Sequence, residues 1–155
     1  GQTPVIETFE SEEAEIEAVA VWLKERMDLG LQPEEIGLFV RSDAQLDRAK
    51  SALNAAELPC KVLDQRVECT PGAVSLCIMH LAKGLEFRAV AVMACDDEVI
   101  PLQERIESAT DTSDLEEVYN TERHLLYVAC TRARDFLLVT SVKPASEFIK
   151  DMNHQ

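Results

Sequence analysis

The stretch AVSLCIMHLAKGLEFRAVAVMAC, residues 73–95, contains two apolar runs separated by a polar segment. The runs, residues 73–79 and 87–95, contain β-branched residues and do not alternate between apolar and polar positions. Strands that are buried on both faces have this pattern, because helices cover both sides of a parallel sheet. We therefore expect two central strands of an α/β fold, joined through the polar segment His80–Glu86.

The flanking segments extend this pattern in both directions. Upstream, hydrophobic periodicity and turn residues predict strands at 5–9, 36–41 and 60–63, and helices at about 11–30 and 42–58. Downstream, we expect an exposed acidic loop at 96–113, a helix opened by a capping box of Ser113 and Glu116 and ending near Ala129, a strand at 136–141 and a helix at 145–151. Strands that alternate with helices favour a mainly parallel sheet with helices on both faces.

Composition limits the possible classes of protein. With 155 residues the chain, residues 1–155, fits a single domain, and no apolar run approaches the roughly 20 residues that span a bilayer. The first residues lack the features of a signal peptide, so we expect a cytoplasmic protein. Five cysteines at irregular spacings indicate reduced thiols rather than a disulfide framework or a metal site.

The formal net charge is −14, which argues against a protein that coats nucleic acid over its whole surface. The acidic residues cluster at 7–17 and 96–117, and most arginines and lysines lie between these blocks. A local groove for nucleic acid therefore remains compatible with the overall charge.

The polar segment His80–Glu86 is the first candidate site, because ligands of open parallel sheets gather at the carboxyl ends of the strands. Gly84 permits a close backbone approach, Lys83 carries a charge suited to phosphate, and Glu86 can accept hydrogen bonds from a ribose. A plain turn with two solvated side chains is the alternative interpretation.

The second candidate segment is TERHLLYVACTRARD, residues 121–135, which places Arg132 at a helix end. On the residues alone, this arginine could equally be a partner of the helix dipole or of a surface carboxylate.

Together, these segments resemble a known family of motor proteins. IMHLAKGLEFRAVAV, residues 78–92, is similar to motif V, and residues 121–135 are similar to motif VI, of the UvrD/PcrA/Rep-like superfamily 1 DNA helicases. Residues 34–64 also resemble the strand, helix and strand that open the second, C-terminal RecA-like core domain of that family. The resemblance implies a RecA-like fold of the P-loop NTPase type, and it extends from about Val5 to Ser141.

The resemblance also implies roles for individual residues. Arg132 matches an arginine finger that reaches the γ-phosphate, and Gly84 and Glu86, with Lys83 beside them, match the part of motif V that meets ATP. His80 matches a position that faces single-stranded nucleic acid. Tyr127 and Thr131 would help to set the helix that aims the arginine finger, with Glu122 and Arg123 as ion-pair supports. A simple structural salt bridge is the alternative interpretation of this last pair.

The sequence departs from the family pattern at three points. Ile78 and His124 stand where the family usually has threonine and arginine, and the accessory 2B domain that the family usually inserts is missing between residues 64 and 73. None of the five glycines, at positions 1, 30, 37, 72 and 84, precedes a lysine in a G-x-x-x-x-G-K-[ST] loop.

The missing Walker A loop defines the expected function. We expect the chain to supply the arginine finger and part of the ATP and single-stranded DNA sites of an ATP-dependent helicase, without hydrolysing ATP alone. The Mg²⁺ ligands would lie on an N-terminal RecA-like domain of the same protein, although VAVMACDDEV, residues 90–99, imitates a Walker B strand that ends in Asp96 and Asp97. We expect a monomer with no membrane association.

Two alternatives remain open at this point. The chain could be a non-catalytic, acidic RecA-like module that binds proteins through residues 96–113. A dinucleotide-binding enzyme is disfavoured, because no G-x-G-x-x-G follows any predicted strand. The residues do not decide between DNA and RNA, or the direction of travel.

Overall fold

The computed structural model describes residues 2–153. It contains one six-stranded sheet in which every pair of neighbouring strands is parallel, with the order β1-β6-β5-β2-β4-β3. The strands are β1 (Val5–Phe9), β2 (Ile36–Val40), β3 (Cys60–Val62), β4 (Val74–Ile78), β5 (Phe87–Val92) and β6 (Ala133–Val142). The α/β prediction with a mainly parallel sheet is confirmed.

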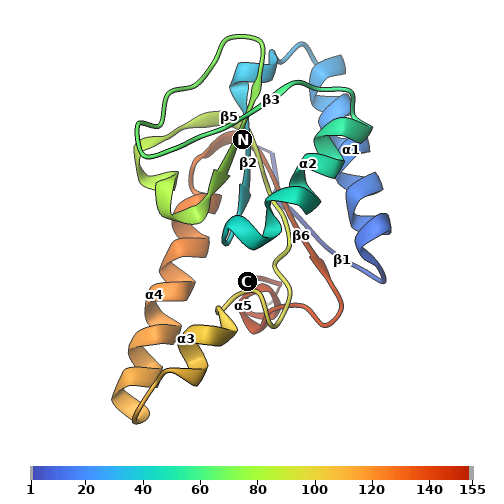
Figure 1. Cartoon of the computed structure of the whole chain (residues 1–155). Helices are drawn as coiled ribbons and strands as arrows, with labels where there is room; N and C mark the ends of the chain where they lie inside the picture. The colour runs from blue at the N-terminus through green and yellow to red at the C-terminus, as the bar shows by residue number, and fades with distance from the viewer. Residues whose placement is uncertain (1, 154–155) are drawn as a thin grey trace.

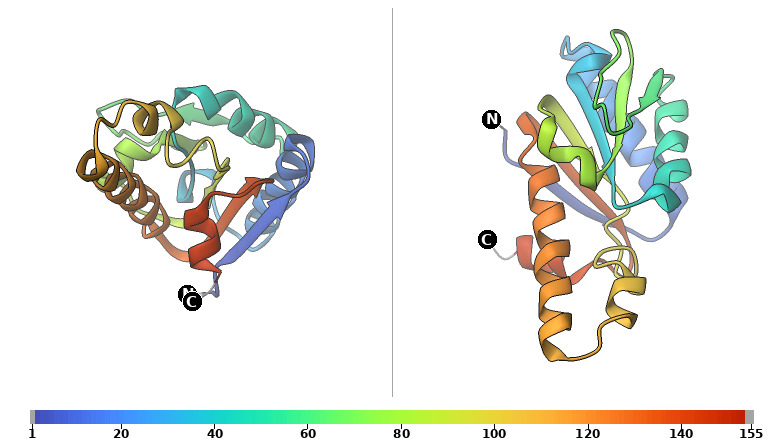
Figure 2. Two further views of the ribbon diagram at one scale, coloured as in Figure 1. Left: turned by 90° about the horizontal axis from the view of Figure 1, so that it is seen from below. Right: turned by 60° about the vertical axis from the view of Figure 1, so that its left-hand side comes forward.

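Helices cover both faces of this sheet (Figure 1). The helical elements are α1 (Glu12–Asp28), η1 (Pro33–Glu35), η2 (Asp43–Gln45), α2 (Leu46–Ala55), η3 (Met79–Gly84), α3 (Gln103–Glu107), α4 (Thr112–Cys130) and α5 (Glu147–Met152), where η denotes a 3₁₀ helix. Figure 2 shows α1 and α2 on one side of the sheet and α4 with η3 on the other.

Two apolar cores follow from this arrangement. One core packs α1 and α2 against β2, β4 and β5, and it includes Leu23, Leu38 and Leu53. The other core lies under η3, α4 and α5, and it includes Phe39 and Leu126. Because β2, β4 and β5 are buried on both faces, the continuous apolar runs of the sequence correspond to the central strands.

Capping residues define the ends of the two long helices. Ser11 Oγ accepts a hydrogen bond from the Ala14 amide at 3.1 Å at the start of α1, and Gly30, with φ of +98°, follows its end. Helix α4 is capped by Asp111, whose Oδ1 accepts from the Asp114 amide at 2.8 Å. The predicted capping box of Ser113 is therefore wrong, because the helix already begins at Thr112.

The acidic segment 96–113 is more ordered than the predicted exposed loop. It contains α3, and Ile100 is completely buried in the core under α4. Its α3 portion and the first turns of α4 extend beyond the carboxyl ends of the strands (Figure 1). The prediction of a wholly exposed loop was wrong, because charge composition does not reveal a single buried anchor.

No helix among residues 2–153 combines the length and the hydrophobicity that a membrane span requires. Strands β3 and β4 are adjacent in the sheet and are joined by residues 63–73 without an intervening helix.

Candidate functional site

Arg132 lies directly against the turn that precedes β5. Its Nη1 donates to the carbonyl oxygens of Leu85 and Lys83 at 3.3 and 3.4 Å, and the Arg132 carbonyl accepts from the Phe87 amide at 2.9 Å. Within residues 2–153, no carboxylate is within ion-pair distance of the Arg132 guanidinium, which is half-buried. The structure thus brings Arg132 into contact with the Lys83–Glu86 turn, although Arg132 and Lys83 are 49 residues apart in the chain.

The turn leaves its polar groups accessible. Lys83, Gly84 and Glu86 are exposed, and the Glu86 carboxylate lies 3.6 Å from Nε of Arg134 in an ion pair at the surface. A Cβ atom added at Gly84 would meet only Val67 Cγ2, at an ordinary contact distance of 3.5 Å. The fold itself therefore does not require glycine at position 84, and the space beside the residue is open to a ligand.

This turn lies at the amino edge of the sheet, where β5 and β6 begin. Phe87 pairs with Ala133, and both residues are the first of their strands. The expectation that the whole segment His80–Glu86 lies at the carboxyl edge is therefore wrong for Gly84 and Glu86. The reason is that β4 and β5 are parallel, so η3 must carry the chain from the carboxyl end of one strand to the amino end of the next.

Two of the expected supporting residues occupy the last turn of α4, next to Arg132. Thr131 Oγ1 donates to the Val128 carbonyl at 2.9 Å and accepts from Arg132 Nη2 at 3.1 Å. Tyr127 is 36% exposed and lines a groove with Cys130 and residues of β1 and α5. The carbonyl of Tyr127 accepts from the Thr131 amide at 2.9 Å, so it contributes to this turn through its backbone.

A second cluster of charged side chains, formed by Arg41, Arg105 and Glu122, lies at the carboxyl edge of the sheet, and Glu122 is at its centre. Its fully buried carboxylate accepts from Arg41 Nε and Nη2 at 2.8 and 2.6 Å, from the Leu102 amide at 2.8 Å and from Arg105 Nη1 at 2.7 Å. Burial alone would raise the pKa of Glu122, but the bonds from Arg41, Leu102 and Arg105 outweigh it and hold the pKa below its usual range.

Arg123 does not form the ion pair that was expected of it. Its guanidinium lies 4.9 Å from the centre of the Phe148 ring and donates to Asn120 Oδ1 at 3.2 Å. Because neighbouring residues of a helix point in different directions, Arg123 faces α5 while Glu122 faces the sheet.

His80 lies at the opposite edge of the sheet from Arg132. It is the second residue after β4 and is exposed, and its pKa is lowered mainly by partial burial and then by the Arg41 guanidinium. Its imidazole is therefore neutral at pH 7 and can both donate and accept a hydrogen bond.

Sequence reasoning missed Arg41 and Arg105 as members of this cluster. Arg41 immediately follows the fully buried strand β2, and this position at the end of a central strand was the available signal. Arg105 offered no comparable signal, because its partner Glu122 lies 17 residues away on another helix.

Asp96, which follows β5 in the segment that resembles a Walker B strand, has a structural role. Asp96 accepts from Arg48 at 2.7 and 3.1 Å and from the Val142 amide at 2.7 Å, so both carboxylate oxygens are engaged. Among residues 2–153, no group of three or more histidine, cysteine, aspartate or glutamate side chains is placed to hold a metal ion.

Comparison with known proteins identifies the family. The family described as the UvrD-like helicase C-terminal domain matches residues 66–144, which include the Arg132 turn and His80. This chain belongs to the UvrD-like helicase C-terminal domain family. ATP-dependent DNA helicase UvrD1 of Mycobacterium bovis is 30% identical to it over 118 residues, which are 69% of this chain and 13% of that helicase.

Other members of this UvrD-like group are similar over shorter segments. ATP-dependent DNA helicase PcrA of Bacillus subtilis is 38% identical over 88 residues, covering 56% of this chain and 11% of that protein. Among solved structures, the C-terminal domain of a possible DNA helicase from Lactobacillus plantarum superposes with a TM-score of 0.70 at 25% identity, covering 99% of this chain and 83% of that one. In contrast to this solved domain, the two full-length helicases are matched over only 13% and 11% of their length.

Proposed function

We propose that this UvrD-like domain is the second motor domain of an ATP-dependent superfamily 1 DNA helicase or translocase. In this proposal it forms one wall of an ATP site, and the N-terminal RecA-like domain of the same protein forms the other wall and supplies the Mg²⁺ ligands. The names of the relatives, which are ATP-dependent DNA helicases, support the proposal.

The placement of Arg132 is the observation that carries the proposal. The guanidinium lies over an exposed turn, has no carboxylate partner within residues 2–153, and is held by carbonyl and hydroxyl oxygens at 3.1–3.4 Å. These bonds orient the group while leaving its charge uncompensated. A guanidinium in this state suits a phosphate better than a guanidinium that is already neutralised.

ATP would supply the phosphoryl group whose transfer develops negative charge on the γ-phosphate oxygens. Arg132 would stabilise this charge, because a fixed positive group at the site of developing charge lowers the barrier. Glu86 would accept hydrogen bonds from the ribose of ATP, and the open space beside Gly84 would let the nucleotide approach the protein backbone. Arg134 would release Glu86 for this role, since exposed ion pairs are weak.

The path of η3 supports coupling between the two sites. This 3₁₀ helix begins next to His80 at the carboxyl edge and ends at Gly84 at the amino edge. Closing a cleft at Gly84 would therefore move the segment that bears His80, which we propose contacts single-stranded DNA. Alternating grip and release at His80 would convert the closure into stepping.

The domain boundaries belong to the same proposal. Residues 1–155 would form one motor domain, from which the accessory 2B domain is missing between residues 64 and 73.

The decisive experiment replaces Arg132 by alanine in the motor protein that contains this chain. DNA-stimulated ATP hydrolysis should fall by about 10³-fold or more, because the γ-phosphate loses its positive partner. Arg88→Ala is the matched control, since Arg88 also lies near this edge but pairs with Asp135 at 3.0 Å. Circular dichroism should show that both variants keep the fold, and an Arg132→Ala variant that retains most of its turnover would refute the proposal.

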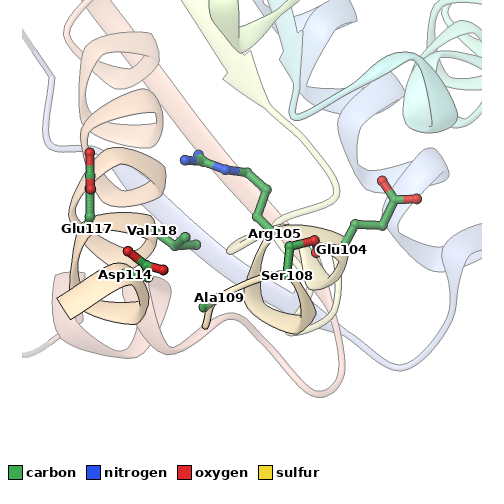
Figure 3. Close-up of a pocket in the computed structure, with 7 residues that line it drawn as sticks. All are labelled: Glu104, Arg105, Ser108, Ala109, Asp114, Glu117 and Val118. Atoms are coloured by element: carbon green, nitrogen blue, oxygen red, sulfur yellow. Dashed lines mark hydrogen bonds between the residues drawn. The ribbon is translucent and has the colours of Figure 1, made fainter. Parts of the chain in front are cut away.

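A protein-binding module remains the second candidate function. A cleft of about 500 Å³ lies between α3 and α4, and its lining includes Glu104, Asp114 and Glu117 (Figure 3). Such a cleft could receive a basic peptide. If the motor hydrolyses ATP normally without Arg132 but loses a protein partner when these carboxylates are replaced by amides, the second function is the correct one.

A further inference from the structure

Arg134 is a second arginine that reaches the turn before β5. Its Nε lies 3.6 Å from Glu86 Oε1, and its side chain is 54% exposed. Arg132 donates to the carbonyl oxygens of Lys83 and Leu85 in the same turn. Two guanidinium groups from the junction of α4 and β6 therefore contact one short turn.

A β-bulge at the start of β6 gives Arg134 this direction. The register between β5 and β6 shifts there by one residue, so that Arg88 on β5 faces both Arg134 and Asp135. A bulge of this kind bends the strand and re-aims a side chain, and such bulges are common beside active sites. Asp135 pairs with Arg88 at 3.0 Å, whereas Arg134 turns to Glu86.

Positive charge exceeds negative charge among the groups in contact at this turn. Three cationic residues belong to the turn or contact it, and these are Lys83, Arg132 and Arg134. Within residues 2–153, none of the three lies within ion-pair distance of a carboxylate other than Glu86. The neighbouring carboxylates of Glu35 and Asp135 both pair with Arg88, at 3.7 and 3.0 Å. The turn therefore suits a ligand that carries several negative charges, as a polyphosphate does.

We propose that Arg134 is a further binding residue of the ATP site and exchanges its partner when the nucleotide binds. The ribose hydroxyls of ATP take Glu86, and the guanidinium that Glu86 releases binds an oxygen of the α- or β-phosphate. Arg132 remains the partner of the γ-phosphate. The inference rests on the proposed function, in which Glu86 accepts hydrogen bonds from the ribose.

The exchange is favourable because both side chains gain a better partner. At 3.6 Å, the contact between Arg134 and Glu86 is too long for a hydrogen bond, and both side chains are more than half exposed. Such a pair contributes little stability, since water and salt screen it. A guanidinium forms short, often bidentate, hydrogen bonds with phosphate, and the carboxylate accepts directly from a hydroxyl.

The test measures nucleotide binding and turnover in the motor protein that contains this chain. Arg134→Ala should raise the Kd of the ATP analogue AMP-PNP and the KM for ATP by about tenfold, as expected for the loss of a charge-assisted hydrogen bond. It should leave kcat nearly unchanged, because an α- or β-phosphate contact is equally strong in the ground state and the transition state. Arg134→Lys should retain most of the affinity.

Lys143→Ala is the matched control. Lys143 directly follows the other end of β6 and forms an exposed ion pair with Glu10, so this variant removes the same charge and the same kind of pair at the opposite edge of the sheet. Its Kd for AMP-PNP and its KM for ATP should equal those of the unsubstituted motor.

Two further ligands test the exchange itself. Dideoxyadenosine triphosphate lacks both ribose hydroxyls and cannot displace Arg134 from Glu86, so Arg134→Ala should weaken its binding by less than about twofold. Adenosine lacks the phosphates, and Arg134→Ala should not weaken its binding at all. An equal loss of affinity for the dideoxy nucleotide would refute the exchange, and an equal loss for adenosine would refute the phosphate contact.

Failure of this inference can be told apart from failure of the proposed function. If Arg134→Ala binds AMP-PNP like the unsubstituted motor while Arg132→Ala loses turnover, the pair of Arg134 with Glu86 is only a surface ion pair and the proposed function stands. If the unsubstituted motor neither binds AMP-PNP nor hydrolyses ATP, both are refuted.

Discussion

At the scale of single residues, Glu122 shows how one buried carboxylate can organise three segments of chain. Its oxygens bind Arg41 after β2, the amide of Leu102 before α3, and Arg105 within α3. Removing the charge would leave Arg41 buried without its partner. The loss of such a partner from a buried pair costs about 3–5 kcal/mol.

We therefore expect Glu122→Gln to lower the free energy of unfolding by about 3 kcal/mol or more at pH 7. The pKa of Glu122 is lower in the folded protein than in the unfolded chain, so its stabilisation is complete above the unfolded pKa and is lost as pH falls through the folded pKa. The difference between wild type and Glu122→Gln should consequently shrink below about pH 4. Urea unfolding at pH 7 and pH 3 measures this, and Glu116→Gln, on the exposed face of α4, is the control.

At the scale of secondary-structure elements, Gly37 and Gly84 differ in whether the packing leaves room for a side chain. A Cβ atom at Gly37 on β2 would lie 2.5 Å and 2.6 Å from two ring atoms of Phe87. The ring also meets Phe39 edge-on, with centroids 6.1 Å apart. Gly37 thus makes room for the residue that anchors the turn at the start of β5.

Gly37→Ala should therefore destabilise the protein by about 1–3 kcal/mol, because the Phe87 ring must shift within a packed core. Gly84→Ala should change stability by less than about 0.5 kcal/mol, since its nearest contact is ordinary. On the proposed function, Gly84→Ala should in addition weaken ATP binding by the intact motor. Thermal unfolding of both variants and nucleotide titration of the second would check this, and equal stability losses would contradict the distinction.

The end of β5 depends on a second ion network, on the other side of the sheet from α4. Arg48 of α2 links Asp96 to the fully buried Glu15 of α1, which also accepts from Thr140 at 2.7 Å and from the Ala94 amide at 3.0 Å. Asp96 consequently joins α2 to the end of β6.

Asp96→Asn should lower stability by about 2–3 kcal/mol at pH 7, because Arg48 loses a charged partner. Asp97→Asn should have an effect within about 0.5 kcal/mol, since Asp97 is exposed and its side chain makes no hydrogen bond within residues 2–153. Urea unfolding with and without Mg²⁺ tests the structural role. A stabilisation by Mg²⁺ that wild type shows and Asp96→Asn lacks would instead indicate a metal ligand.

At the scale of the whole molecule, the exposure of the cysteines shows which thiols the two apolar cores shield from solvent. Cys60 and Cys69 are exposed, whereas Cys77, Cys95 and Cys130 are buried. Burial raises the pKa of the Cys77 thiol, with a smaller contribution from Cys69, and the pKa of the Cys130 thiol, in both cases to about 12.

Two of the five thiols should therefore react rapidly with a disulfide reagent at pH 8 in the folded protein. The three buried thiols should react only as fast as the protein unfolds, because the thiolate is the reactive species and these groups remain protonated and inaccessible. Double substitution Cys60→Ser and Cys69→Ser should abolish the rapid phase. Rapid modification of a third thiol would show that one core opens without global unfolding.

Much of the fold could be predicted because the signals are local. The non-alternating runs at 73–79 and 87–95 became β4 and β5, and Ser11 caps α1 as its position indicates. The strand at 136–141 was predicted too short, since β6 extends from Ala133 to Val142. Charged residues at its start, such as Arg134, do not have the pattern of a buried strand.

The candidate site was predictable in its members but not in its geometry. The two motifs named Arg132, Gly84 and His80, and the structure has Arg132 beside the turn and His80 at the opposite edge. The predicted parallel sheet already required the segment between β4 and β5 to cross from one edge to the other, and the expectation of a site wholly at the carboxyl edge overlooked this. Only the structure showed that the crossing is made by η3 and that His80 and Gly84 lie at its two ends.

The order of apolar residues by itself determined the strands, the helices and the class of the fold, since burial repeats with the period of each element. Only the tertiary structure decided which polar and charged side chains meet. Arg41 and Glu122 are 81 residues apart, and Glu15 and Thr140 are 125 residues apart. The pairing of charges depends on which strand ends become neighbours, and this is settled by the packing of the whole sheet, not by the sequence around either residue.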